Sequence, residues 1–467
     1  MIFPLMLFNS LDRKAYGNRI FDPVISELIS LESNGITFQD RTIYFVLSVC
    51  VGDNKGINSM LGFTESFSSN YWCRFCTLKK DILQKSLTES PSYLRDKRNY
   101  EIHLKSKSSK ETGIVSECNF NVLRDFHAVE NYSVDVMHDI FEGILNLEIS
   151  LIILSYIRTE KYFTIDDINN RINFFDYGHI HNLNRPPQLC LDNLKTLKIR
   201  YSASEMMVFS KYLGIIIGDW IPENDSKWEL FKILMEIIKI ILSDSISNSM
   251  ISQLEILITE HHKMFVEIFQ LPLRPKHHLM LHYPRVIRNI GPLTQVWSMR
   301  FESKHKVFKE IARSTKSRTN ICLSILKRYT LKQKTDFETF NISQKIKSFG
   351  PKIQNYSQMF KKLLNEDKDV EFYKWISFCN VIIKANVVLE IGHNGEYTQY
   401  GLVEEIGFSK ANSKVYVFLK KMNTLYYDCN RFCDIVELIN EKQAIILTHG
   451  FIKTYNLIHF NSLNMVL

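Results

Sequence analysis

Four stretches in the middle of the chain carry apolar residues at intervals of three and four positions. They lie at residues 134–157, 202–221, 225–242 and 252–269. This spacing puts the apolar side chains on one face of a helix, which can then pack against a neighbour. The pattern predicts that residues 133–275 are mainly helical.

The first 53 residues show a different alternation. The stretches "IFPLMLF" (2–8) and "TIYFVLSVCVGD" (42–53) are rich in β-branched and aromatic residues and are typical of buried strands. Between them, Asp22 and Pro23 mark the start of a helix and Gly35 marks its end. The order strand, helix, strand predicts the edge of an α/β sheet.

The pattern becomes β-like again near the C-terminus. Short runs of β-branched and aromatic residues lie at 380–391, 398–408, 414–421 and 443–449. They predict a small β-rich domain over residues 378–467. We interpret residues 341–377 as a linker with helical character.

Composition places the chain among ordinary globular proteins. Of 467 residues, 45% are hydrophobic and 23% are charged, and the net charge of +8 permits an anionic partner such as nucleic acid. Nine cysteines without a framework spacing argue against a secreted disulfide scaffold. The apolar start lacks a basic leader, and the longest apolar stretch (147–157) is short and carries Glu148. These features predict a soluble intracellular protein without a membrane span.

Two pairs of soft ligands are separated by about 200 residues. Cys73-x-x-Cys76 places two thiols on one turn, and His277 and His282 are separated by four intervening residues, with His278 as an alternative first ligand. Two thiolates and two imidazoles are the donors of a structural Cys2His2 zinc site. The alternative is two half-buried thiols and a histidine-rich helix end in solvent.

Several acidic residues stand where chemistry is often found. Asp53 follows the second predicted strand, so its carboxylate would point into the crevice at a sheet edge, or else cap a turn. Glu302 lies near the start of a helix, where a solvent-facing position is the alternative. Asp135 precedes His138 by three residues, a spacing that lets the acid cap a helix and bond the imidazole.

The helix that begins near Glu302 is basic. Its candidate DNA-binding residues are Lys304, Lys306, Lys309 and Arg313. A positive helix beside a carboxylate cluster would let a phosphodiester approach metal ions held by the acids. A solvated helix face is the alternative interpretation.

The joint order of these motifs resembles the DDE transposases, most closely the CACTA (En/Spm)-like group. The resemblance covers residues 4–330 roughly and rests on "GDN", "YWCRFC", "VDVMHDIFEGIL" and "KHHLMLHYP…FESKHKVFK". It implies an α/β fold: an RNase H-like core interrupted by a large, mostly helical insertion. By this resemblance residues 1–60 are a partial core, 61–290 the zinc-stapled insertion and 291–340 the final core helix.

The resemblance also implies roles for single residues. Asp53 matches the second catalytic Asp, Glu302 the catalytic Glu and His138 the His of the Asp-x-x-His motif. Cys73, Cys76, His277 and His282 match the zinc ligands. In the family, three acids hold two Mg²⁺ or Mn²⁺ ions for DNA strand cleavage and transfer.

One acid of the family pattern has no match in this chain. Only 52 residues precede Asp53, and "IFPLMLFNSLDRKAYGN" resembles the third core strand and the turn after it. We therefore expect the first two core strands, with the first catalytic Asp, to be missing, and the chain as given to be a truncated and inactive transposase.

The resemblance implies DNA at transposon ends as the partner, a nuclear location and, by analogy alone, a homodimer. Two alternatives stay open. One is a non-catalytic, zinc-stapled scaffold that binds DNA or protein. The other is a helical interaction module with a β tail and no metal.

Overall fold

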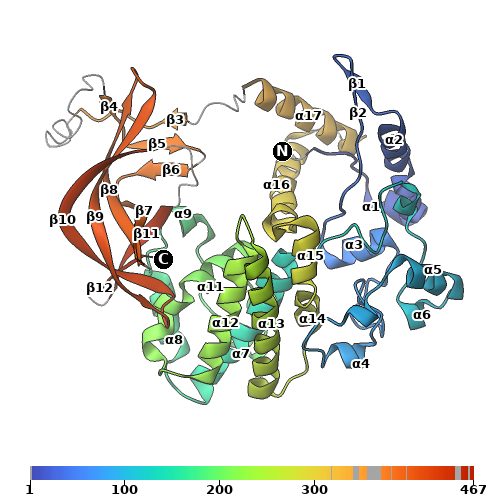
Figure 1. Ribbon diagram of the computed structural model, residues 1–467, viewed down its shortest axis with the longest axis horizontal. Coiled ribbons are helices and arrows are strands. Elements are labelled where there is room, and N and C mark those ends of the chain that lie inside the picture. Colours follow the sequence, from blue (N-terminus) through green and yellow to red (C-terminus); the bar gives the residue numbers. More distant parts are fainter. Residues whose placement is uncertain are drawn as a thin grey trace. The chain divides into compact units, whose positions relative to one another are not determined.

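The computed structural model describes residues 3–316, 318–339, 346–354, 370–379, 381–395, 397–447, 454–460 and 463–466. The chain is mixed α/β and divides into two compact units, each assembled from separate segments (Figure 1). Unit 1 comprises Met1–Lys161, Leu189–Met207 and Asn224–Asp336. Unit 2 comprises Tyr162–Gln188, Val208–Glu223 and Phe337–Leu467.

Unit 1 is mainly helical. Its α-helices are α1 (Ser10–Tyr16), α2 (Asp22–Ser33), α3 (Asn54–Leu61), α4 (Lys80–Leu83), α5 (Lys97–Ser106), α6 (Ser109–Thr112), α7 (Leu145–Arg158), α10 (Leu191–Lys195), α12 (Ser226–Ile241), α13 (Asn248–Phe269), α14 (Pro275–Met280), α15 (Tyr283–Ile290), α16 (Ser298–Ser314) and most of α17 (Ile321–Thr339). Its shorter helical segments are η1 (Gly17–Phe21), η2 (Pro91–Tyr93), η3 (Asn119–Val122), the π-helical η4 (Met137–Ile144) and η7 (Leu293–Gln295).

The helices predicted in the middle of the chain are confirmed. Residues 134–157 correspond to η4 and α7, 225–242 to α12 and 252–269 to α13, while 202–221 corresponds to α11 (Ala203–Ile217) and η6 (Gly218–Trp220). Helices α7, α12 and α13 lie close together in Figure 1. Their apolar side chains surround a buried cluster that includes Leu230, Phe265 and Leu273.

The helix Met137–Arg158 is also long and apolar enough to cross a membrane, by length and composition, and it is the one such helix in the described part of the chain. In unit 1 it lies in the interior. Ile149, Ile153 and Tyr156 are fully buried, and so is Glu148. Its apolar surface is thus covered by neighbouring helices, as in the core of a globular protein.

The two N-terminal strands predicted from the sequence are largely not formed. Residues 3–9 have no strand, and Phe3 and Leu5 are exposed. Of the second stretch only β2 (Arg41–Ile43) forms, in a hairpin with β1 (Ile36–Phe38), while residues 44–49 stay without regular structure. An extended segment needs a partner strand for its backbone groups, and within the described residues these two segments have none. The RNase H-like core is therefore not confirmed.

One contact of the second stretch matters for the site. The Cys50 N–H donates to the Asn131 carbonyl (2.8 Å), and the Ser133 N–H donates to the Cys50 carbonyl (3.2 Å), in a parallel bridge. This bridge places the residues before Asp53 beside the residues before Asp135.

Unit 2 is built around antiparallel sheet. Its strands are β3 (Ile346–Phe349), β4 (Val370–Phe372), β5 (Trp375–Phe378), β6 (Val381–Lys384), β7 (Val387–Asn394), β8 (Tyr397–Ser409), β9 (Lys414–Asp428), β10 (Cys433–Ile446), β11 (Thr454–Phe460) and β12 (Leu463–Val466). The pairings run from β8 through β9, β10, β12, β11 and β7 back to β8, so the sheet curls into a barrel, with β4 added beside β8.

The small sheet β3–β5–β6 shares a core with this barrel, because Ile376 and Ile383 pack in one buried cluster with Val403 and Val417. The predicted C-terminal β domain is thus present, but strands begin at Ile346. The prediction of a linker with helical character over 341–377 is wrong for its described residues, which form β3, β4 and β5. Strands of three or four residues are too short to display a period.

Unit 2 also takes helical segments from the middle of the chain. They are α8 (Ile165–Phe174), α9 (Gly178–His181), η5 (Asn182–Asn184), the end of α11 and η6. Helix α11 packs closely on the turn between β9 and β10, because a Cβ on Gly214 would lie 2.7 Å from the carbonyl oxygen of Arg431.

The predicted insertion at 61–290 is divided between the two units, since its residues 162–188 and 208–223 belong to unit 2.

Candidate metal centre and acidic pocket

Two cysteines and two histidines converge inside unit 1. Cys73, Cys76, His278 and His282 are all buried, and their ligand atoms lie within 4.8 Å of one another. The Cys76 Sγ is 3.4 Å from His278 Nε2, and the Cys73 Sγ is 3.6 Å from His282 Nε2. Two soft thiols and two imidazoles are the donor set of a closed tetrahedral site, so the cluster could bind a metal ion such as zinc.

The structure corrects one of the predicted ligands. His278 joins the cysteines, and His277 does not. His278 and His282 are four residues apart at the end of α14 and the start of α15, so their rings reach the same side, and their Nε2 atoms are 3.1 Å apart. His277, one residue earlier, points about 100° away around the helix. Of the two histidines that the sequence left open, the alternative is therefore the one in place.

The aromatic residues of "YWCRFC" pack on the ligand rings. The Trp72 ring meets His278 edge-on at 5.5 Å between centroids, and Phe75 stacks on His282 at 4.5 Å. The backbone N–H of Phe75 also points at the Cys73 sulfur (3.4 Å). These contacts exclude water from the cluster and fix the rotamers of its donors.

An outer carboxylate orients His282. The His282 Nδ1–H donates to Glu89, which also accepts from Arg285 Nε at 3.1 Å. This leaves the Nε2 lone pair free to face the cysteines, as in many metal-binding histidines. Burial opposes ionisation of Glu89, but the hydrogen bond from His282 lowers the pKa of this carboxyl below its usual value.

The cluster favours one thiolate. Burial opposes ionisation of Cys73, but a hydrogen bond from Cys76 and the nearby imidazoles lower the pKa of Cys73 well below its usual value. The same hydrogen bond and burial raise the pKa of Cys76. A thiolate beside imidazoles is a site prepared for a cation.

His277 belongs to a separate buried network. Its Nε2–H donates to Glu148 Oε1 (3.0 Å), while His261 Nε2–H donates to Glu148 Oε2 (3.1 Å). All three side chains are fully buried. Burial alone would raise the pKa of Glu148, but the interactions with His261 and His277 lower it to about 2. The carboxylate thus holds His277 away from the cysteines.

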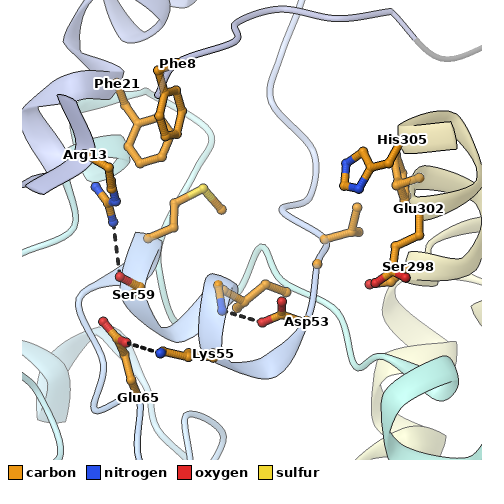
Figure 2. A pocket seen from close by; sticks show the side chains of 16 residues that line it. Phe8, Arg13, Phe21, Asp53, Lys55, Ser59, Glu65, Ser298, Glu302 and His305 are labelled. Carbon is orange, nitrogen blue, oxygen red and sulfur yellow. Dashed lines mark hydrogen bonds and ion pairs between the residues drawn. The ribbon is translucent and has the colours of Figure 1, made fainter. Parts of the chain in front are cut away.

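Asp53 and Glu302 line one pocket of about 510 Å³ in unit 1. Figure 2 shows Asp53 at the start of α3 and Glu302 on α16, across the pocket from it. Asp53 is the N-cap of α3, since its Oδ1 accepts from the Gly56 N–H at 2.6 Å. Both carboxylates are exposed. The turn-capping interpretation of Asp53 is therefore confirmed, and its second oxygen remains on the pocket side.

The Asp135-x-x-His138 pair contacts two residues of α16 that line the pocket, Ser298 and Glu302. The His138 Nδ1–H donates to Asp135 Oδ2 at 2.5 Å, and the other oxygen of Asp135 accepts the backbone N–H of Ser298, the first residue of α16 (3.0 Å). His138 Nε2 then lies 3.6 Å from Glu302 Oε1. A single buried carboxylate thus orients both the imidazole and the helix that carries Glu302.

The Asp135 carboxylate also makes His138 more basic than an ordinary histidine. The hydrogen bond to Asp135 raises the pKa of His138 to about 9, and the carboxylates of Glu142 and Glu302 add to the shift. An imidazolium therefore faces Glu302 near neutral pH. This positive charge lies beside one of the two pocket acids, with His138 Nε2 3.6 Å from Glu302 Oε1.

The basic residues of α16 do not all lie on one face. Positions 302, 306, 309 and 313 follow the three- and four-residue helical repeat, so Lys306, Lys309 and Arg313 are in line with Glu302 and are exposed. No ion pair involving these three is present in the described part of the chain. Lys304, about 200° around the helix from Glu302, lies on the half-buried face.

Several contacts of the site were missed from the sequence. Glu89 and Ser298 are joined to their partners by hydrogen bonds that span 193 and 163 residues, which no local spacing reveals. Glu148 did carry a signal, because a carboxylate within an apolar helix needs a buried partner.

Comparison with protein-family models and with curated proteins found no match for this chain.

Proposed function

We propose that this chain is a transposon-derived, DDE transposase-like protein that binds DNA along α16 beside the pocket of Asp53 and Glu302. The observation that carries the proposal is the pairing of two features in unit 1. The Cys2His2 cluster joins chain segments about 200 residues apart, and the two acids that match the family pattern line one pocket. Each feature is expected from the motif order, and neither follows from local sequence.

The zinc ion is proposed to have a structural role. Four protein ligands would close its coordination, and none of the ligand side chains is exposed. Its binding would stabilise the fold by holding the turn of Cys73 against α14 and α15.

The pocket acids supply hard oxygen donors of the kind that Mg²⁺ and Mn²⁺ prefer. Asp53 and Glu302 would hold such an ion, which would polarise a phosphodiester oxygen when bound. In the described residues they do not belong to a group of three close ligand atoms. The chain matches two of the three acids of the family pattern, and we propose that it binds DNA without cutting it.

The exposed row of Lys306, Lys309 and Arg313 is proposed to contact the phosphate backbone. Each phosphate that a cation neutralises releases counterions, so binding weakens steeply with salt. His138, held by Asp135, keeps a further positive charge near Glu302. The acids of the pocket and the cations on α16 and at His138 would therefore meet one DNA backbone.

Fluorescence anisotropy with labelled duplex DNA tests this proposal. Lys306→Glu and Lys309→Glu together are expected to weaken binding and to reduce the slope of log K against log salt by about 2. Lys304→Glu changes the charge of the same helix on its other face and serves as the matched control. Equal losses in the control, or no binding by the wild type near about 0.1 M salt, would contradict the proposal.

A nicking assay with Mg²⁺ and Mn²⁺ tests the proposal that the chain does not cut DNA. No strand cleavage is expected. Cleavage that Glu302→Ala abolishes would show an active site. It would contradict the proposed lack of cleavage but not the proposed DNA binding.

A protein-interaction scaffold is the second candidate, and the closed, buried Cys2His2 cluster favours it because such a site is structural wherever it occurs. In that case charge reversal on α16 would leave binding to partners unchanged. The salt dependence of DNA binding separates the two functions.

A further inference from the structure

Arg74 stands between the two cysteines of the metal-binding turn and is almost fully buried, with 1% of its surface exposed. Its guanidinium makes two strong hydrogen bonds. Nη1 donates to Asn54 Oδ1 (2.8 Å) and Nη2 donates to the carbonyl oxygen of Ser133 (2.8 Å). Asn54 follows Asp53 at the start of α3, and Ser133 precedes Asp135 by two residues. One side chain therefore joins the turn to both segments that lead into the acidic pocket.

The positive charge of Arg74 is balanced through an amide bridge. Asn54 accepts from Arg74 with Oδ1 and donates from Nδ2 to Asp139 Oδ1 (2.7 Å), and Asp139 also accepts from the Tyr283 hydroxyl (3.2 Å). Hydrogen bonds of this kind offset part of the cost of burying a cation and a carboxylate in a protein interior. Because Asn54 serves both ions at once, the first turn of α3 has one preferred position.

The guanidinium is also stacked against a ring that contacts a metal ligand. Its central carbon lies 4.7 Å above the Phe75 ring, and Phe75 in turn stacks on His282. The position of Arg74 thus depends on the position of a ligand of the cluster, through one aromatic ring.

A second buried arginine provides a comparison. Arg95 donates from Nε to the carbonyl oxygen of Cys73 (3.2 Å) and from Nη2 to that of Thr112 (2.7 Å). It holds the same turn, but it is bonded to neither α3 nor the segment at Ser133. The two arginines are alike in charge and burial and differ in what they connect.

We propose that Arg74 is a positioning residue that couples the Cys2His2 cluster to the acidic pocket, by fixing Asn54 beside Asp53 and Ser133 beside the Asp135–His138 pair. The coupling itself follows from these hydrogen bonds, and only its use in DNA or cation binding rests on the proposed function. Loss of the metal would then loosen both pocket segments together.

Hydrogen–deuterium exchange on the full chain tests the coupling. Removal of zinc by a chelator should speed exchange at residues 54–58 and 133–137 by about tenfold or more, because these segments lose a shared anchor. Arg74→Met should show the same increase with one zinc still bound per chain, measured by metal analysis. Arg95→Met, the matched control, should leave both segments at wild-type rates and speed exchange near Thr112.

Two results would overturn the coupling. One is wild-type exchange in both segments of zinc-loaded Arg74→Met, and the other is an equal increase in Arg95→Met, which would indicate general loosening. Arg74→Lys keeps the charge and can make one of the two bonds, so an intermediate rate is expected. If Arg74→Met does not fold, Arg74→Lys decides alone, and wild-type exchange in both segments would then refute the inference.

A Mn²⁺ titration followed by electron paramagnetic resonance tests the consequence for the pocket. Wild-type binding should be lost in Asp53→Asn and weakened by about 10- to 100-fold in zinc-loaded Arg74→Met, as for other residues that orient ligands. Unchanged Mn²⁺ affinity in Arg74→Met would overturn the link to the pocket. Absence of Mn²⁺ binding in the wild type would contradict the proposed cation site, and the exchange rates would still decide the coupling.

Discussion

The Cys76 sulfur and the His278 Nε2 atom lie 3.4 Å apart, although 202 residues separate them in the chain. This contact closes a loop that includes most of unit 1's helices. A metal ion at this place would constrain the unfolded chain over the same length and would hold two distant segments in the folded one.

The two neighbouring histidines of α14 should respond differently to substitution. His278→Ala removes a cluster ligand, so we expect loss of the bound zinc and of its contribution to folding, which for structural sites is roughly 10–16 kcal/mol in total. His277→Ala should keep about one zinc per chain. Metal analysis of the two purified variants checks this. Zinc retained in His278→Ala but lost in His277→Ala would restore the ligand set predicted from the sequence.

Glu148 should contribute stability that depends on pH. Its pKa is lowered to about 2 in the folded chain from its usual value of 4.5. A carboxyl with a depressed pKa stabilises the fold above the unfolded value, and this stabilisation is lost as pH falls toward the folded value. The shift corresponds to roughly 3 kcal/mol.

Glu148→Gln isolates this effect. The variant should be less stable than the wild type near neutral pH, and the difference should shrink as pH falls from about 5 toward about 3. Urea unfolding of both proteins in the same metal state gives the difference in their free energies of unfolding. If this difference stays constant between about pH 5 and about pH 3, the charge of Glu148 is not what stabilises its contacts with His261 and His277.

Asp135→Asn should disturb two elements at once. The amide cannot accept from both His138 Nδ1 and the Ser298 N–H, and a lost hydrogen bond to a charged group costs about 1.5–3 kcal/mol. We expect this loss of stability together with a lower pKa of His138, measured by NMR titration of the imidazole. Glu142→Gln is the control, since Glu142 is exposed and 3.8 Å from His138, and it should change stability by less than about 1 kcal/mol. A similar loss in both variants would argue against a special role for Asp135.

Gly214→Ala should destabilise unit 2. A Cβ there would lie 2.5 Å from the Phe432 ring and 2.7 Å from the Arg431 carbonyl oxygen, so α11 or the turn must move. Overpacking of this kind costs about 1–3 kcal/mol, which exceeds the helix-propensity gain of about 1 kcal/mol for alanine over glycine. Thermal unfolding of the variant and the wild type shows whether the substitution stabilises or destabilises the protein. A rise in melting temperature would show that the turn can move aside without loss of stability.

The sequence by itself determined most of the local structure. The helices at 225–242 and 252–269 and the strands after residue 378 follow from side-chain periodicity, which is a local property. It also indicated the residue types of the candidate metal cluster, because Cys73 and Cys76 are close along the chain. The predicted N-terminal strands did not form, because apolar composition alone supplies no partner for residues 44–49.

Only the tertiary structure decided which residues act together. It selected His278 over His277 because Glu148, on another helix, binds His277, and it joined Asp135 to Ser298 across 163 residues. It also divided the segment 61–290 between two units and placed Arg74 between α3 and Ser133. These choices depend on packing between distant segments, and a one-dimensional pattern carries no information about which distant side chains compensate a buried charge.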